Sequence, residues 1–206
     1  MENRWDLAAK ARGDFADLLD SLTEEQLAGS TLCKGWTPLD VAGHLVSFVE
    51  LTLPSMMLSM AKAGFNADKA WIANAEKYKA MGVPAISSAL RAKGSKTAPM
   101  SSFSSGVVIM DVAVHTQDVR RGLGLDGELD PEVLRYGLDW VTTHKQRKIH
   151  VPEKDIDGLK LEATDIDWSW GTGAAVSGPA EAILMAINGR DVRSELDGDG
   201  VSQLPS

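Results

Sequence analysis

The stretch Asp111-Val-Ala-Val-His115-Thr-Gln-Asp118 is the most informative part of this chain, because it sets three ionisable side chains into an otherwise apolar run. The surrounding apolar residues predict a largely buried helix. Positions i, i+4 and i+7 share one face of a helix, so Asp111, His115 and Asp118 form a stripe that points toward the core. Burying an unpaired carboxylate is costly. The stripe is therefore either a buried Asp–His hydrogen-bonded network or part of a metal site.

A second segment, Trp36-Thr-Pro-Leu-Asp-Val-Ala-Gly-His44, has the features of a helix start. Thr37 suits the N-cap position, Pro38 the first helical position, and Asp40 the third position of a capping box. His44 then falls on the apolar, inward face of the helix. A single inward histidine is more often an ordinary core residue than a metal ligand. A ligand role for His44 is therefore supported only by the ionisable residues of the Asp111–Asp118 helix.

Together the two helices offer two imidazoles and one carboxylate, from His44, His115 and Asp111. This is the ligand set of many catalytic zinc and iron(II) sites, in which coordination positions stay open. Asp118 could be a fourth ligand, a partner that orients an imidazole, or a helix-packing group. We favour the orienting or structural role, because ligating histidines usually donate their second ring N–H to such a partner.

The segments GWTPLDVAGHL and DVAVHTQDVRRGLG, with the tail LKLEATDIDWSWGTGAAVSGPAEAILMAINGR, resemble the mycothiol-dependent maleylpyruvate isomerase family of the DinB-like metalloprotein superfamily. In that family a histidine of the second helix and a Glu-x-x-x-His pair of a later helix bind a divalent metal. The resemblance implies the same role for His44, Asp111 and His115. The chain departs from the pattern at Asp111, where an aspartate replaces glutamate and shortens the reach by about 1.5 Å.

The resemblance implies a metal-dependent enzyme that uses a low-molecular-weight thiol such as mycothiol. The enzyme would either transfer this thiol to a small electrophilic substrate or use it to isomerise that substrate. Zinc is the first candidate for the metal, with nickel or iron as alternatives. A metal-dependent hydrolase is the runner-up, and a non-catalytic metal-binding stress-response module is the rival from another class. The sequence identifies no general base. Trp36, Arg120 and Arg121 are candidate substrate-binding residues, although the two arginines also suit a helix C-terminus.

Charge and cysteine content narrow the classes of partner and compartment. The net charge is −8, from 29 acidic and 21 basic residues, which argues against nucleic acid or an anionic membrane as a partner. The single cysteine, Cys33, excludes an internal disulfide and fits a reducing compartment. Lys34 could favour its thiolate, but a lone loop cysteine is usually incidental. His144 and His150 lie in a charged stretch and are poor ligand candidates. We expect a cytoplasmic monomer or homodimer with small-molecule partners.

The predicted fold class is α+β, mainly α. We expect a DinB-like four-helix bundle with the metal site in residues 1–147 and a small α+β domain in residues 148–206. Helices are expected at 4–22, 38–60 with a break at Pro54, 68–93 with a break at 82–84, around the Asp111 stripe as far as Gly122 or Gly124, 131–144 and 180–189. Strands are expected at 159–163 and around Trp168 to Trp170, with 201–204 as a candidate strand.

Overall fold

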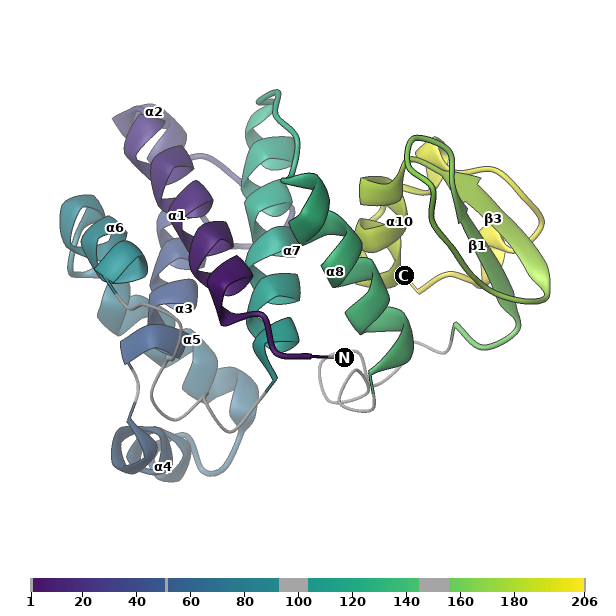
Figure 1. Ribbon diagram of the computed structural model, residues 1–206. Helices are drawn as coiled ribbons and strands as arrows, with labels where there is room; N and C mark the ends of the chain where they lie inside the picture. The colour runs from purple at the N-terminus through teal and green to yellow at the C-terminus, as the bar shows by residue number, and fades with distance from the viewer. Residues whose placement is uncertain (1, 51, 93–103, 145–155, 206) are drawn as a thin grey trace. The chain divides into compact units, whose positions relative to one another are not determined.

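The computed structural model describes residues 2–50, 52–92, 104–144 and 156–205 (Figure 1). The chain divides into two compact units, Glu2–Glu128 and Leu129–Ser206. Within the described residues, no helix combines the length and the apolar character that crossing a membrane requires.

The N-terminal unit is entirely helical in its described part. Its helices are α1 (Trp5–Ser21), α2 (Glu24–Leu27), α3 (Pro38–Glu50), α4 (Leu53–Lys62), α5 (Ala67–Lys79), α6 (Val83–Ala92) and α7 (Ser105–Leu123). Helices α1 and α3 each pack against both α6 and α7, which gives a four-helix bundle, and α5 lies along α3. The predicted fold class is confirmed.

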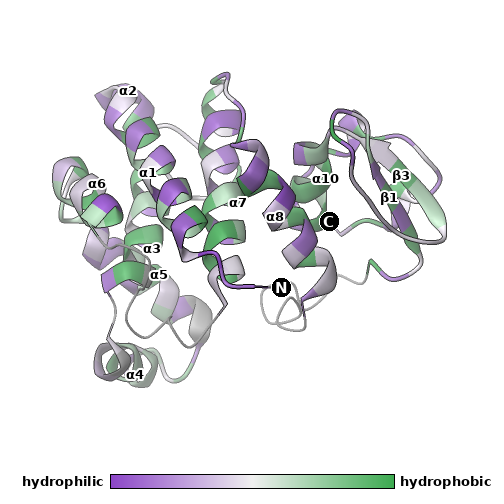
Figure 2. Ribbon diagram, viewed as in Figure 1, coloured by the Kyte–Doolittle hydropathy of each residue, from purple (hydrophilic) through white to green (hydrophobic). Residues whose placement is uncertain are grey.

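Helix α7 is largely buried within this bundle. Hydrophobic residues dominate its first half and hydrophilic residues gather toward its C-terminal end (Figure 2). Val107, Ile109, Ala113 and Val119 are at most 1% exposed. Removing such side chains from water contributes roughly 25 cal/mol per Å² of apolar surface. The apolar packing of α7 therefore fixes the positions of the polar side chains that it also carries.

The predicted start of α3 is present as a capping box. The backbone N–H of Thr37 donates to Asp40 Oδ2 at 2.9 Å, and the backbone N–H of Asp40 donates to Thr37 Oγ1 at 3.3 Å. Pro38 is the first residue of the helix, where its missing N–H costs nothing. Lys79 of α5 donates to Asp40 Oδ1 at 2.7 Å, so the same aspartate also joins two helices.

The helices break close to the predicted positions, although the first break comes before Pro54 and not at it. Thr52 caps α4 and Pro54 lies in its first turn, so this proline begins a new helix instead of kinking an old one. The break expected at 82–84 separates α5 from α6. Helix α7 ends at Gly124, whose φ of 63° is the left-handed conformation that glycine accepts most easily.

The C-terminal unit combines helices with a small sheet. It contains α8 (Pro131–Thr143), β1 (Leu159–Ala163), β2 (Ser169–Gly171), β3 (Ala174–Gly178) and α10 (Ala180–Ile187), followed by the short 3₁₀ helices η2 (Arg193–Glu195) and η3 (Val201–Gln203). The sheet order is β2-β1-β3, with β1 antiparallel to β2 and parallel to β3. Helix α8, which the sequence placed with the bundle, packs on α10 in this unit.

Two local predictions for this unit need correction. Strand β3 was not expected, because its small residues Ala174 and Ala175 give little alternation of apolar and polar side chains. The candidate strand at 201–204 was wrong, since Val201–Gln203 forms a 3₁₀ helix. Gly198, with a φ of 113°, turns the chain just before it, and Asp199 accepts a hydrogen bond from the backbone N–H of Ala175.

Candidate metal-binding site

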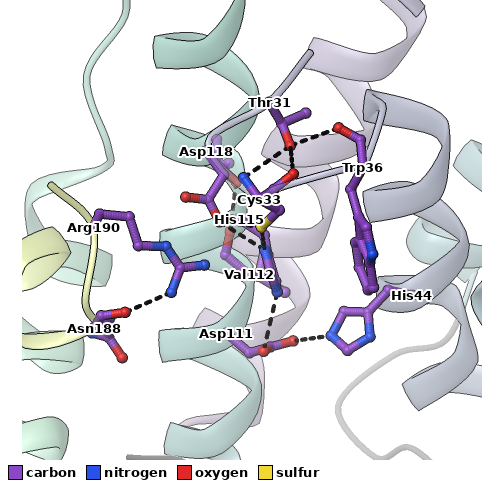
Figure 3. Close-up of polar contacts among 11 residues, drawn as sticks. Thr31, Cys33, Trp36, His44, Asp111, Val112, His115, Asp118, Asn188 and Arg190 are labelled. Atoms are coloured by element: carbon purple, nitrogen blue, oxygen red, sulfur yellow. Dashed lines mark hydrogen bonds and ion pairs between the residues drawn. The ribbon is translucent and has the colours of Figure 1, made fainter. Parts of the chain in front are cut away.

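Helices α3 and α7 bring His44, Asp111 and His115 together inside the N-terminal unit (Figure 3). His44 Nε2 lies 3.4 Å from Asp111 Oδ2, and His115 Nε2 lies 3.6 Å from Asp111 Oδ1. The two imidazole centroids are 5.0 Å apart. The structure thus places the three predicted ligands side by side, and their binding of a metal ion stays a prediction.

The spacing of these three side chains fits a divalent cation. Ligand atoms bound at about 2.1 Å in a tetrahedral arrangement lie roughly 3.4 Å from one another. The distances of 3.4 and 3.6 Å from the Asp111 oxygens to the two imidazoles match this edge length. The aspartate is one methylene shorter than the glutamate of the family pattern, yet both of its oxygens face a histidine. Three protein ligands leave at least one coordination position open.

Asp118 lies on the other side of the His115 ring and is fully buried. His115 Nδ1 is 2.9 Å from Asp118 Oδ2, so a proton on Nδ1 is donated to the carboxylate. The lone pair of Nε2 then points toward Asp111. This carboxylate–histidine arrangement fixes both the tautomer and the ring orientation of a metal ligand. The contact supports the orienting role predicted for Asp118.

The surroundings of His115 favour a positive charge. Burial lowers the pKa of His115, but the nearby Asp111 charge and the hydrogen bonds with Asp118 and Cys33 outweigh it and raise the pKa to about 10. Two carboxylates around one imidazole therefore attract either a proton or a metal ion. A divalent cation bound at Nε2 would take the place of that proton.

Two tryptophans lie against the histidines. The Trp36 ring stacks over His115, with centroids 6.3 Å apart, and meets His44 edge-on at 5.4 Å. Trp71 of α5 meets His44 edge-on at 6.2 Å. His44 is only 8% exposed. These rings limit the access of water to the imidazoles, and Trp36, a candidate substrate-binding residue, contacts both of them.

Cys33 is part of this cluster, which the sequence analysis did not anticipate. Its Sγ donates to Asp118 Oδ2 at 3.0 Å and lies 3.5 Å from His115 Nδ1. Cys33, His115 and Asp118 form a second group whose ligand atoms lie within 4.8 Å of one another. No local pattern predicts this contact, because 85 residues separate Cys33 from Asp118 along the chain.

Arg12 of α1 is a second residue that the sequence analysis missed. It is 1% exposed, and burial lowers its pKa. Together with Asp111 and apolar residues of α3 and α7, Arg12 lines a small internal cavity. Its position could have been found from the helical phase, because Arg12 lies four residues after Ala8 and three before Phe15, both of which are buried.

The remaining candidates have other surroundings. Arg120 donates to Gln117 Oε1 at 3.2 Å and to the backbone oxygen of Glu128 at 2.9 Å, which ties α7 to the loop that follows it. Arg121 is half-buried in the last turn of the same helix. A substrate-binding role for either arginine stays a prediction. In the C-terminal unit the ring of His144 stacks on Trp140, whereas His150 lies outside the described residues.

One known protein family matches the N-terminal part of the chain. Residues 8–99 match the family described as the mycothiol maleylpyruvate isomerase N-terminal domain. The predicted family resemblance is confirmed. The matched region contains His44 and ends before α7, so Asp111 and His115 lie outside it.

Two solved structures resemble the chain over most of its length. The crystal structure of a histidine-to-alanine mutant of the mycothiol-dependent maleylpyruvate isomerase has a TM-score of 0.56 and 17% sequence identity, and the similarity covers 95% of this chain and 91% of that one. A second crystal structure of that isomerase has a TM-score of 0.54 and 18% identity, with the same coverage. Identities this low show a shared fold. Among curated proteins no sequence matches the chain.

Proposed function

We propose that this protein is a metal-dependent enzyme that uses a low-molecular-weight thiol, mycothiol or a close analogue. The enzyme either transfers this thiol to a small electrophilic substrate or uses it to isomerise that substrate. The observation that carries the proposal is the set of two imidazoles and one carboxylate with the spacing of a metal-ligand triad. The match to the mycothiol maleylpyruvate isomerase N-terminal domain supports the choice of thiol.

Each residue of the site has a distinct role in this proposal. His44, Asp111 and His115 would hold a divalent cation, and zinc is the first candidate because two histidines and one carboxylate are a common zinc set. When bound, such an ion lowers the pKa of a thiol in the open position, so that the thiolate is available at neutral pH. Asp118 accepts the hydrogen bond from His115 Nδ1 and would thereby keep Nε2 free to bind the cation.

The chemistry requires few further groups. The thiolate would add to one carbon of a conjugated carbon–carbon double bond, so that a carbon–sulfur bond forms, the π bond breaks and its electron pair moves onto the conjugated carbonyl as an enolate. Transfer would keep the carbon–sulfur bond, with the enolate taking a proton from water. Isomerisation would follow rotation about the carbon–carbon bond, now single, when the enolate re-forms the double bond and expels the thiolate. No protein base is needed to ionise the nucleophile once it is a thiolate. Trp36, stacked on His115 and edge-on to His44, would exclude water and provide an apolar surface for the substrate.

The rival functions differ in what occupies the open coordination position. A hydrolase would use a metal-bound water, and a non-catalytic module would close the position with a fourth protein ligand. Asp118 is the obvious fourth ligand in sequence terms, but its carboxylate faces Nδ1 of His115, on the side of the ring opposite to Nε2. This geometry favours an open position over a closed one.

The test has two steps. Elemental analysis of the purified protein and titration of metal into the apo form should give one divalent ion per chain. Cobalt-substituted protein should then develop a sulfur-to-cobalt absorption band when mycothiol is added, and a weaker one with glutathione. Absence of a stoichiometric metal would overturn the proposal, while metal binding without any response to thiols would favour the hydrolase.

A further inference from the structure

The loop that carries Cys33 is fixed to helix α7 at several points. The backbone N–H of Leu32 donates to the backbone oxygen of Asp118 at 3.0 Å, and the backbone N–H of Cys33 donates to Thr31 Oγ1 at 3.1 Å. At Gly122 an added Cβ would lie 2.4 Å from Thr31 Cα, so glycine is what allows the loop to approach this closely. These backbone contacts therefore fix the position of the Cys33 thiol relative to α7.

Within this arrangement one carboxylate oxygen accepts hydrogen bonds from two side chains. Asp118 Oδ2 is 3.0 Å from Cys33 Sγ and 2.9 Å from His115 Nδ1 (Figure 3). The thiol is half-buried, whereas the carboxylate is fully buried. A buried carboxylate needs donors that satisfy its oxygens and hold its orientation. Cys33 supplies one of these donors from a different part of the chain.

We propose that Cys33 is a positioning residue, whose S–H group holds the Asp118 carboxylate in the orientation that accepts the Nδ1 proton of His115. This inference rests on the proposed metal site. Through Asp118 the thiol sets the direction of the His115 ring and the readiness of Nε2 to bind the cation. Supporting contacts of this kind decide how precisely a ligand is held.

The same three residues could instead be a ligand set of their own, with Cys33 Sγ, Asp118 and Nδ1 of His115 around a cation. Two observations favour the positioning role. The distance of 2.9 Å between Nδ1 and Oδ2 is that of a direct hydrogen bond, shorter than the separation of two atoms sharing a cation. In addition, a cation bound at Nδ1 would not be coordinated by Asp111 and His44, which lie near Nε2 on the other side of the ring.

The experiment compares two substitutions at one position. In Cys33→Ala the donor is lost, while in Cys33→Ser a hydroxyl donor of similar size remains. Zinc affinity is measured by competition with a chelator, and thermal unfolding of the apo proteins is followed by circular dichroism. Cys33→Ala should weaken zinc binding about 3- to 10-fold, below the 10- to 100-fold typical of a direct partner of a ligand. Cys33→Ser should remain within about twofold of the wild type.

A double-mutant cycle shows whether the effect passes through the carboxylate. In an Asp118→Asn background, Cys33→Ala should cause little further loss of zinc affinity, because the orienting carboxylate is already absent. Equal losses in both backgrounds would overturn the proposal, as would wild-type zinc affinity in folded Cys33→Ala. A cysteine-to-cobalt absorption band in thiol-free wild-type protein, lost in both Cys33 variants, would make Cys33 a ligand and overturn its positioning role.

These outcomes are separable from failure of the proposed function. If the wild-type protein binds no divalent cation, both proposals fail together. If it binds zinc and responds to mycothiol while Cys33→Ala does the same with equal affinity, only the inference about Cys33 fails. A purely structural role for Cys33 predicts a lower unfolding temperature of the apo protein with unchanged affinity of the folded fraction.

Discussion

Both units of the chain satisfy buried polar side chains locally, as Thr116 of α7 does with the backbone oxygen of Val112, and the N-terminal unit also brings together ionisable side chains from separate elements. In the C-terminal unit, Thr142 donates to the backbone oxygen of Leu138, and Asn188 donates to that of Leu184, each four residues earlier in its own helix. In the N-terminal unit, the contact between His44 and Asp111 spans 67 residues, and Cys33 reaches across the chain to Asp118. Local bonding to a helix backbone needs no other explanation, whereas convergence of ionisable groups from separate elements is the pattern of a functional site.

The largest expected effect tests this contrast directly. His115→Ala should abolish stoichiometric metal binding, because it removes the ligand that connects Asp111 to Asp118. His144→Ala should leave metal binding intact, since this ring stacks on Trp140 in the other unit. Metal content after reconstitution of both apo proteins is the measurement. Equal metal content in the two variants would show that the site has been placed on the wrong histidine.

A smaller effect is expected from the charge of Asp111. Asp111→Asn keeps the shape and removes the negative charge, so zinc affinity should fall more than about tenfold. Asp111→Glu should retain binding, because glutamate occupies this position in the related pattern. If Asp111 only hydrogen-bonds the histidines, asparagine should bind zinc like the wild type and change the unfolding temperature alone. Isothermal titration of zinc into the two apo variants distinguishes a ligand from a structural partner.

How far the sequence predicted this site depends on the range of the contacts. The stripe of Asp111, His115 and Asp118 lies on one helix, so helical spacing alone predicted its common face. The inward phase of His44 followed from the apolar residues that share its helix face, and the capping box at Thr37 marked only where that helix begins. Cys33 could not be placed in this way, because its partners are determined by how a loop packs on α7. The helical position of Arg12, on the same face as buried residues of α1, predicts that it is buried, although a charged residue is usually expected at the surface.

The fold shows the same division between local and distant information. Local features such as the cap at Thr37 and the end of α7 at Gly124 are set by a few neighbouring residues, and these were predicted. Strand β3 is determined by its pairing with β1, because the sequence of β3 has only a weak strand pattern of its own. The grouping of α8 with α10 likewise depends on packing, since nothing in the sequence of α8 says which apolar surface it covers.

A third prediction sharpens the role of the loop contact at α7. Gly122→Ala should destabilise the protein by about 1–3 kcal/mol, because the new Cβ would lie 2.4 Å from Thr31 Cα. It should also weaken zinc binding by displacing the loop that carries Cys33. Gly13→Ala is the matched control: a Cβ at Gly13 in α1 meets nothing within 4 Å. That substitution should stabilise by about 0.5–1 kcal/mol, because alanine favours a helix interior over glycine. Chemical unfolding measures both changes.

The smallest expected effect comes from a long-range pair at the edge of the same unit, Asp40 with Lys79. Burial raises the pKa of Asp40, but hydrogen bonds with Lys79 and Thr37 outweigh this and hold it below the ordinary value. A lowered folded-state pKa contributes stability that is present above the unfolded value, about 3.9 for aspartate, and is lost as the pH falls through the folded value. Lys79→Met should therefore cost about 0.5–1 kcal/mol at neutral pH. Below about pH 4 this deficit should shrink.

The Asp40–Lys79 pair also tests whether every long-range polar contact of the N-terminal unit affects the metal site. Lys79→Met should leave zinc affinity unchanged, because the Asp40–Lys79 contact is half-exposed and joins α3 to α5 without contacting the imidazoles. The exposed Lys69 of α5 provides the control, since Lys69→Met should change neither stability nor its dependence on pH. A loss of zinc affinity in Lys79→Met would mean that a polar pair between distant parts of the chain can influence zinc binding even when the pair is partly exposed. Unchanged affinity would instead restrict the functional pattern to long-range pairs in which both side chains are largely buried, as in the contact between His44 and Asp111, whose side chains are 11% and 18% exposed.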